Sequence, residues 1–521
     1  MRQLNGWLTV AGMLLVVALG AGCGDQPPAP AAAPVPLTIY HFNDFHAAWT
    51  PLTRPTDQGG DGGQEWAGAV NIAGMIKQFR RDDSSCIVAF GGDMFLANPV
   101  DSRTQGASTV ELFRAFAPDV ATLGNHEFDY GREQLLQLRK RINWPLVCAN
   151  VTWQNQPLVD ETVVLERNGL KILCVGLFPT NGAKYYEEDH DVAISEALPA
   201  VKKALAAAAG DHDLTVIVSH LGDDADVALA KALPADLGVD VIIGAHTHTA
   251  LKEAITEHGI IITQAGANGE YFGKLELLVD PAANTAQLTA YALLPVQDGS
   301  EDADPAVAQL LQAELAAVAG LREPLATLDQ PLWNSGRSEE TPLGNFVTDA
   351  YVDIFHADLA FVDSKGLRRY IAGPELTEFD LRGALSGERP LQKVRMSGAD
   401  LRKFLDYYVK KDDRYMSIPY TLSYTYSGSG SRAKLDELLF RDEPIDEERE
   451  YTVIAEDRLA ETMCKFNGGE LLGDAAGDGV AVLIDWAKRQ RTLTLRAGNR
   501  RQQAGAAGQR DRDRPRRRDA A

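Results

Sequence analysis

Short runs of Val, Ile, Leu and Cys alternate with longer amphipathic stretches between residues 37 and 298, and this alternation constrains the fold more than any other feature. Apolar runs separated by helices are typical of strands buried on both faces of a layered α/β domain. The predicted strands are LTIYHF, CIVAF, VATLG, LVCANV, ILCVGLF, LTVIVSH, VDVIIGAH and GIIITQAG, and the predicted helices cover 65–81, 108–116, 131–141, 196–209 and 225–236. Apolar and polar side chains alternate over 273–294, which indicates an antiparallel hairpin closing the domain.

The 521 residues are too many for one ordinary core, so we expect further domains. Residues 299–322 contain a predicted helix that begins at Asp304-Pro305, and they are interpreted as a linker. A second, smaller α+β domain is predicted over 323–495. Residues 496–521 hold nine Arg, three Asp and no aliphatic run, a composition that predicts a disordered tail.

The N-terminus has the pattern of an export signal. An apolar stretch, 7–19, follows Arg2 and is too short to span a bilayer comfortably. Small residues then precede Cys23, an arrangement that resembles a bacterial lipoprotein signal, although Gly20 stands where that signal usually has an aliphatic residue. We therefore expect residues 1–22 to be a signal peptide and Cys23 to be lipidated, with a plain signal peptide as the alternative.

Residues 23–36 are rich in Pro and Ala and are predicted to form an extended tether. The expected location is exported and membrane-anchored, facing the periplasm or the cell exterior. The other four cysteines show no disulfide framework and are expected to be free thiols.

The formal net charge of −22 disfavours nucleic-acid polymers as partners, because a polyanion would be repelled over most of the surface. Small phosphorylated substrates remain compatible with this charge, since bound divalent cations reverse the local potential.

Metal-binding side chains follow five of the predicted strands at the point where each strand ends. In α/β sheets, ligands bind beyond the carboxyl ends of the strands, so these groups are expected to meet at one rim. The candidates are Asp44, His46, Asp93, Asn125, His126, His220, His246 and His248. A His, Asp and Asn set suits Mn²⁺, Zn²⁺, Fe²⁺ or Mg²⁺, and so many ligands suit two ions that share a bridge. Two adjacent ions activate water and stabilise both the attacking and the leaving oxygen of a phosphate ester.

Five sequence blocks resemble those of the calcineurin-like metallophosphoesterases. They are HFNDFHA (41–47), GGDMFLANP (91–99), GNHEFDYG (124–131), SHLG (219–222) and GAHTHT (244–249). GNHEFD is especially similar to the 5′-nucleotidase branch, which includes periplasmic UDP-sugar hydrolases. The resemblance implies a four-layer α-β-β-α domain over 37–298 and a 5′-nucleotidase C-terminal domain over 323–495, with a hinge between them near 303–320.

The resemblance also implies a role for each residue. One metal ion would be held by Asp44, His46, Asp93 and His248, and the other by Asp93, Asn125, His220 and His246, with Asp93 bridging. His126 would face the phosphate, and Asp129 would orient it and keep it cationic near neutral pH. Asp129 also suits the N-cap of the helix predicted at 131–141.

The second domain resembles the family less closely. TPLGNFVTDAY (341–351) is similar to the helix that opens the family's C-terminal domain. Arg337 and Arg368 lie where the family carries phosphate-facing arginines, whereas Asp363 and Lys365 depart from its pattern; exposed salt bridges are the alternative reading of both arginines. The family's base-stacking aromatic residues correspond to Gly387 and Arg458 here, which weakens the expectation of base stacking, although a guanidinium plane can itself stack.

The sequence thus predicts a dimetal enzyme that hydrolyses phosphate esters, with 5′-nucleotides as the first candidates. A 2′,3′-cyclic nucleotide or a non-nucleotide phosphate ester is the nearest alternative. A surface lipoprotein that binds a phosphorylated ligand without turnover is the alternative of another class.

Overall fold

The computed structural model describes residues 33–53, 65–96, 98–180, 191–208, 210, 212–297, 304–333, 340–368, 371–385, 387, 389–411, 415–473, 475–496 and 498–503. The predictions for the signal peptide, for Cys23 and for Arg337 lie outside these residues. In the described part, no helix combines the length and the apolar character needed to cross a membrane.

Two six-stranded sheets form the centre of the first domain. One has the order β17-β16-β1-β4-β5-β6, in which β1 runs parallel to β4 and antiparallel to β16. The other has the order β14-β15-β13-β12-β10-β9. The strands of the first sheet are β1 (Val35–Phe42), β4 (Ile87–Phe90), β5 (Val120–Thr122), β6 (Leu146–Val147), β16 (Tyr271–Asp280) and β17 (Thr285–Pro295). Those of the second are β9 (Thr162–Arg167), β10 (Leu170–Leu177), β12 (Leu214–Ser219), β13 (Val241–Gly244), β14 (Ile255–Glu257) and β15 (Ile260–Gln264).

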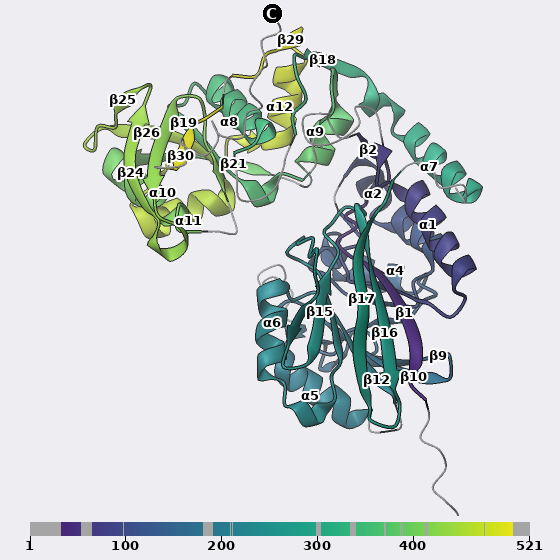
Figure 1. The fold of residues 1–521 in the computed structure, drawn as a ribbon. Coiled ribbons are helices and arrows are strands. Elements are labelled where there is room, and N and C mark those ends of the chain that lie inside the picture. The colour runs from purple at the N-terminus through teal and green to yellow at the C-terminus, as the bar shows by residue number, and fades with distance from the viewer. Residues whose placement is uncertain are drawn as a thin grey trace, which may run out of the picture.

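Helices cover the outer face of each sheet, which gives the four layers α-β-β-α (Figure 1). The first sheet packs against α1 (Ala69–Asp82), α3 (Ala107–Phe116), α4 (Gly131–Arg139) and α7 (Pro305–Ala317). The second packs against α5 (Ala197–Ala207) and α6 (Asp223–Ala232). Buried aliphatic side chains of both sheets, such as Ile39 and Val216, fill the space between them. The predicted fold class is confirmed, and β16 and β17 form the predicted closing hairpin.

The predicted linker helix belongs structurally to the first domain. Val307, Leu311 and Leu315 of α7 are buried in the same core as α1 and α3, and Arg103 pairs with Glu314. Asp304 caps the N-terminus of α7 by accepting hydrogen bonds from the backbone N–H groups of Ala306 and Val307.

The second domain is built on one mixed sheet with the order β22-β19-β26-β21-β27. Its strands are β19 (Leu359–Asp363), β21 (Pro390–Ser397), β22 (Met416–Ser417), β26 (Glu450–Glu456) and β27 (Glu470–Leu471). One face packs on α8 (Pro342–Phe355), α9 (Glu378–Ala384) and α12 (Gly479–Ala487). The other face packs on α10 (Gly398–Tyr408), α11 (Asp457–Asn467), β23 (Leu422–Ser427) and β24 (Lys434–Phe440).

The prediction of a disordered tail from residue 496 is wrong for the described residues 496 and 498–503. Residues 501–503 form β30 (Arg501–Gln503), which pairs in parallel with β23. Arg500 is buried and makes a bidentate ion pair with Asp349, with both N–O distances at 2.8 Å. The prediction rested on charge composition, which does not reveal that one arginine has a buried acidic partner. The predicted tail beyond Gln503 lies outside the described residues.

The four described cysteines are free, as predicted. Cys86, Cys148 and Cys174 are buried, and burial raises the pKa of Cys148 and of Cys174 to about 12.

Candidate metal centre and substrate cavity

Five loops of the first domain bring the predicted ligands to one rim. They follow β1, β4 and β5 of one sheet and β12 and β13 of the other, and these strands end at the same edge of the two-sheet core. The predicted convergence is therefore observed for the His and Asp ligands, which fall into three overlapping groups. Asn125 is buried at the start of the short helix η2 (Asn125–Phe128), directly beyond β5.

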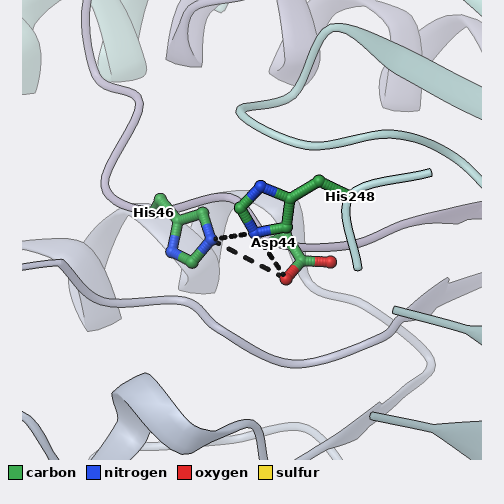
Figure 2. Close-up of side chains that lie close together, drawn as sticks. All are labelled: Asp44, His46 and His248. Carbon is green, nitrogen blue, oxygen red and sulfur yellow. Dashed lines mark hydrogen bonds and ion pairs between the residues drawn. The ribbon is translucent and has the colours of Figure 1, made fainter. Parts of the chain in front are cut away.

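Asp44, His46 and His248 form the first group (Figure 2). The Nε2 atoms of His46 and His248 are 2.9 Å apart, and Nε2 of His248 is 3.3 Å from Oδ1 of Asp44. Asp44 and His46 are buried, and His248 is partly buried.

Asp93 belongs to the other two groups, one with His220 and His246 and one with His46 and His126. Its Oδ2 lies 3.1 Å from Nε2 of His220 and 3.8 Å from Nε2 of His46. Asp93 thus lies between the two sets of ligands, which is the position predicted for a bridging carboxylate.

The backbone at these ligands is strained in a consistent way. Asp44, His46, Asp93, His246 and His248 all have positive φ values, between 50° and 74°. Side chains other than glycine rarely adopt this left-handed conformation, and such residues concentrate at functional sites. The surrounding structure therefore holds the backbone of these five residues in a conformation that they would otherwise rarely adopt.

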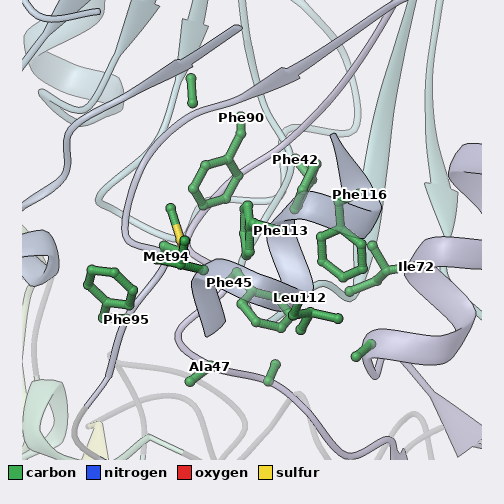
Figure 3. Close-up of a cluster of buried hydrophobic side chains, with 14 of the residues drawn as sticks. Phe42, Phe45, Ala47, Ile72, Phe90, Met94, Phe95, Leu112, Phe113 and Phe116 are labelled. Carbon is green, nitrogen blue, oxygen red and sulfur yellow. The ribbon is translucent and has the colours of Figure 1, made fainter. Parts of the chain in front are cut away.

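An aromatic core supports the ligand loops. Phe45, between Asp44 and His46, is fully buried, and its ring packs edge-on against Phe113 at 5.4 Å and Phe116 at 5.9 Å. Figure 3 shows these rings together with Phe42 and Phe90. Because close-packed aromatic cores deform little, the neighbouring ligands are fixed in place.

Glu127 supports the site and was missed by the sequence reasoning. Its buried carboxylate accepts hydrogen bonds from the backbone N–H groups of Asp93 (3.0 Å), Met94 (2.6 Å) and Gly124 (2.5 Å). It therefore joins the loop after β4 to the loop after β5. The only signal was its position within GNHEFD, next to His126.

Two further contacts orient ligand side chains. Nδ1 of His220 donates to the carbonyl oxygen of Gly91 at 2.7 Å, which leaves Nε2 as the atom directed at Asp93. The amide of Asn43 donates to Oδ2 of Asp44 at 2.7 Å. Such outer contacts fix the tautomer and the direction of a metal ligand.

The charges of this cluster favour a bound cation. Burial, reinforced by His248, lowers the pKa of His46 well below its usual value, so that ring is neutral and able to coordinate. Burial acts to raise the pKa of Asp93, but His220 and His126 outweigh it, and the pKa is lowered. Burial likewise opposes protonation of His220, but Asp93 and Asp44 raise its pKa to about 10. The buried carboxylates therefore attract positive charge strongly.

The spacing of the ligand atoms fits metal coordination. Two ligands at about 2.1 Å from one ion that are also 2.9 Å apart, as the two Nε2 atoms of His46 and His248 are, subtend roughly a right angle at that ion. The 3.3 Å and 3.1 Å pairs at His248–Asp44 and His220–Asp93 give similar angles. All the atoms involved are nitrogen or oxygen, which suits the predicted divalent ions.

His126 connects the metal cluster to the second domain. Its Nδ1 is 2.9 Å from Oδ2 of Asp129, and its Nε2 is 3.3 Å from Nη2 of Arg368. Burial alone would lower the pKa of His126, but Asp129 and Asp93 raise it. Arg368 can only donate, so Nε2 is the acceptor in this arrangement. Asp129 therefore contacts His126 as predicted, and the alternative reading of it as a helix cap is wrong, because Tyr130 is the N-cap of α4.

A cavity of about 580 Å³ opens beside His126 and Asp129 between the two domains. The first domain contributes part of its wall through α2 (Pro99–Thr104) and the residues before it. The second domain contributes Arg368, Arg382, Leu385, Gly387, Asp478 and Val480. No Phe, Tyr or Trp is among the described residues that line it.

The predicted substrate residues differ in their placement. Arg368 and Gly387 line the cavity, whereas Arg458 is exposed in the first turn of α11 and is not among the lining residues. Gly387 has φ +84°, a conformation that favours glycine. The backbone conformation at residue 387 therefore accounts for a glycine at this position. Arg382, Asn98 and Ser102 also line the cavity. Sequence reasoning assigned none of them a role, although Asn98 lies within the block GGDMFLANP.

Comparison with known proteins identifies both domains. Residues 37–250 match the family described as calcineurin-like phosphoesterase, and residues 324–467 match the 5′-nucleotidase C-terminal domain. An apyrase from Anopheles gambiae is 25% identical over 453 residues, which cover 78% of each chain.

Solved structures share the fold. A 5′-nucleotidase precursor from Thermus thermophilus has a TM-score of 0.77 at 21% identity, covering 90% of this chain and 100% of that one. A sulfate thiohydrolase from the same organism, in complex with glycerol, has a TM-score of 0.76 at 17% identity, covering 92% of this chain and 98% of that one. At such identities the likeness shows the fold alone.

Proposed function

We propose that the chain is a hydrolase of the kind that joins a calcineurin-like phosphoesterase domain to a 5′-nucleotidase C-terminal domain. It hydrolyses phosphate monoesters in this proposal, with 5′-nucleotides as the first candidate substrates. The observation that carries the proposal is the contact between His126 and Arg368 at the wall of a cavity beside the buried Asp and His cluster.

The ligands divide between two ions in this proposal. Asp44, His46 and His248 would hold one ion, Asn125, His220 and His246 would hold the other, and Asp93 would contact both. When bound, the two ions supply an activated water and stabilise the attacking and leaving oxygens of the ester. Their identity would be Mn²⁺, Zn²⁺, Fe²⁺ or Mg²⁺, given the nitrogen and oxygen ligands.

His126 and Arg368 would bind the phosphoryl group from the side of the cavity. Nη2 of Arg368 and Nε2 of His126 lie 3.3 Å apart. An anion placed between them would accept from Arg368 and from the protonated form of His126. Asp129 and Asp93 favour that protonated form by raising the pKa of His126 against the effect of burial. Arg368 offers a permanent positive charge and a planar set of donors that matches phosphate oxygens. Asp129 would hold Nδ1 of His126, so that Nε2 faces the anion.

A non-nucleotide ester or a 2′,3′-cyclic nucleotide is the second candidate substrate. The absence of aromatic side chains among the described residues that line the cavity favours the non-nucleotide ester, since base stacking on an aromatic ring typically contributes about 1–3 kcal/mol per base. The phosphoryl group of a non-nucleotide monoester would bind in the same way, and only the leaving group would differ. A 2′,3′-cyclic nucleotide is instead a diester with one negative charge, and its hydrolysis opens the ring without releasing phosphate.

Product formation from a substrate panel tests the proposal, with phosphate release measured for the monoesters and chromatography of the products used for UDP-glucose and 2′,3′-cyclic AMP, whose first hydrolysis frees no phosphate. A protein lacking residues 1–23 would be assayed with Mn²⁺ or Zn²⁺ on AMP, UMP, UDP-glucose, 2′,3′-cyclic AMP and glycerol phosphate. Release that favours AMP or UMP supports the nucleotidase assignment, and release from glycerol phosphate alone transfers it to the second candidate. No product from any substrate, in protein that contains bound metal, would favour the alternative of a binding protein without turnover.

We also propose that the protein is exported and anchored to a membrane through a lipid on Cys23. The support is the short apolar segment before small residues and a cysteine. Metabolic labelling with a radioactive fatty acid should label the full chain and should fail to label Cys23→Ser. Equal labelling of both proteins would contradict the anchor.

A further inference from the structure

Arg389 is a nearly buried arginine of the second domain, with 8% of its surface exposed, and the sequence reasoning gave it no role. Its guanidinium donates in three directions. Nε donates to the carbonyl oxygen of Leu385 at 3.2 Å, Nη1 bonds to the carboxylate of Glu456, and Nη2 bonds to the carbonyl oxygen of Gly366. One side chain therefore joins its own segment, through Leu385, to two segments that are distant in the sequence.

The backbone of Arg389 adds a fourth segment. Its N–H donates to Oδ2 of Asp478 at 2.7 Å, and its carbonyl oxygen accepts from the N–H of Gly479 at 2.8 Å. These contacts hold the start of α12 against the loop that precedes β21.

The joined segments carry most of the cavity wall that the second domain contributes. Gly366 lies two residues before Arg368, and Leu385 lies two residues before Gly387. Asp478 lines the cavity itself, and Val480 follows Gly479. Arg389 is not among the lining residues, so it contacts the wall from behind.

The lack of a side chain at Gly366 gives independent evidence that Arg389 packs closely against this loop. A Cβ atom added at Gly366 would lie 2.6 Å from Nη1 of Arg389, a separation that would force the side chain or the loop to move. Glycine at this position therefore permits the close approach of the guanidinium to the loop that carries Arg368.

Only arginine satisfies these partners together. Its planar guanidinium offers several donors in fixed directions, whereas a lysine ammonium is a compact charge on a flexible stem. Removing the guanidinium would leave the buried carbonyl group of Leu385, the partly buried carbonyl group of Gly366 and the carboxylate of Glu456 without these bonds.

We propose that Arg389 is a positioning residue for phosphate recognition: it holds the loop at 364–368 so that Arg368 reaches the cavity wall beside His126. The proposal rests on the proposed function, because it assigns Arg368 to the phosphate. It predicts that Arg389 acts through Arg368 rather than through its own charge.

A double-mutant cycle on the binding of inorganic phosphate tests this proposal. Calorimetry on the Mn²⁺-loaded full chain would compare the wild type, Arg389→Met, Arg368→Met and the double variant. Each single variant should bind phosphate about 10-fold more weakly or worse, because small displacements at such sites have large effects. The double variant should bind no more weakly than Arg368→Met, since Arg389 has nothing left to position.

Two further variants separate positioning from charge and from folding. Arg389→Lys keeps the positive charge and is the milder change if Arg389→Met unfolds. It should bind phosphate more weakly than the wild type, because lysine lacks the planar set of donors. Arg500→Met removes another buried arginine of the same domain. Arg500 pairs with Asp349, which lies outside the segments that Arg389 joins. It should lower the unfolding temperature and leave phosphate affinity unchanged.

Several outcomes would overturn the proposal. They are additive losses in the double variant, full affinity in Arg389→Met or in Arg389→Lys, an equal loss in Arg500→Met, or a wild type that binds no phosphate. Phosphate binding without turnover of any ester would instead count against the proposed function alone, because the double-mutant cycle measures phosphate affinity and not catalysis.

Discussion

Arg368 of the second domain donates a hydrogen bond to Nε2 of His126 of the first domain, at 3.3 Å and across 242 residues of sequence. On its other side, His126 contacts Asp129 through Nδ1. The imidazole is therefore held between a carboxylate of its own domain and a cation of the other, at the cavity wall.

Replacing His126 should reduce turnover without emptying the metal centre. We expect His126→Ala to lower kcat for the preferred ester by about 100-fold or more, the usual range for a group that acts on the transition state. Asp129→Asn should lower kcat less, because it only loosens the ring. Metal analysis and steady-state kinetics check this, with the exposed His258→Ala as the control. Unchanged kcat in His126→Ala would contradict the assigned role.

Arg368 and Arg458 of the second domain should behave differently. Arg368→Lys should raise KM about 10-fold or more, since lysine cannot present a planar pair of donors. Arg458→Ala should change KM less than about twofold, because Arg458 does not line the cavity. Initial-rate kinetics on one phosphate ester measure both effects. A larger effect of Arg458→Ala would show that the base or sugar reaches α11.

Much of the first domain could be predicted because its signals are local. Buried parallel strands give continuous apolar runs, and a ligand such as Asp93 follows its strand directly in the sequence. The rim site then follows from the general geometry of α/β sheets.

The features that were missed depend on partners distant in the sequence. Arg389 contacts Gly366, 23 residues earlier, and Glu456, 67 residues later, and nothing near residue 389 predicts those two contacts. Arg500 was interpreted as part of a disordered tail because its partner, Asp349, lies 151 residues earlier. Burial of a charged residue becomes visible only when its opposite charge is placed beside it.

Asp101 should make stability depend on pH. It is fully buried, and burial raises its pKa to about 7, although Thr109 and Tyr130 donate hydrogen bonds to it. Asp101 binds its proton more tightly in the folded protein than in the unfolded chain. The free energy of unfolding therefore falls as the pH rises from the unfolded pKa of Asp101, near 4, to its folded pKa, near 7. The loss amounts to about 1.4 kcal/mol per pH unit for one such group.

Asp101→Asn removes this titration. Urea unfolding at pH 5.0 and pH 7.0 should show a smaller fall in the free energy of unfolding for Asp101→Asn than for the wild type. The exposed Asp224→Asn, as the control, should keep the fall of the wild type. An identical fall in all three proteins would show that Asp101 does not titrate in this range.

The C-terminal residues up to Gln503 should be needed for the stability of the second domain. A chain ending at Leu495 lacks Arg500 and β30 and leaves Asp349 buried without its cation. Breaking a buried pair in this way typically costs about 3–5 kcal/mol. Thermal unfolding should show a lower midpoint for a chain ending at Leu495 and an unchanged midpoint for one ending at Gln503. Equal midpoints for the two shortened chains would mean that the Arg500–Asp349 pair contributes little.

The most direct test of the dimetal account is to count the metal ions and follow phosphate release as they are removed and returned. We predict two divalent ions per chain by elemental analysis, loss of activity on dialysis against chelator, and recovery when Mn²⁺ or Zn²⁺ is added. Asp93→Asn should retain fewer ions and should lower kcat/KM by about 1,000-fold, because Asp93 lies between both sets of ligands. Full activity in the chelated protein, or in Asp93→Asn, would contradict the account.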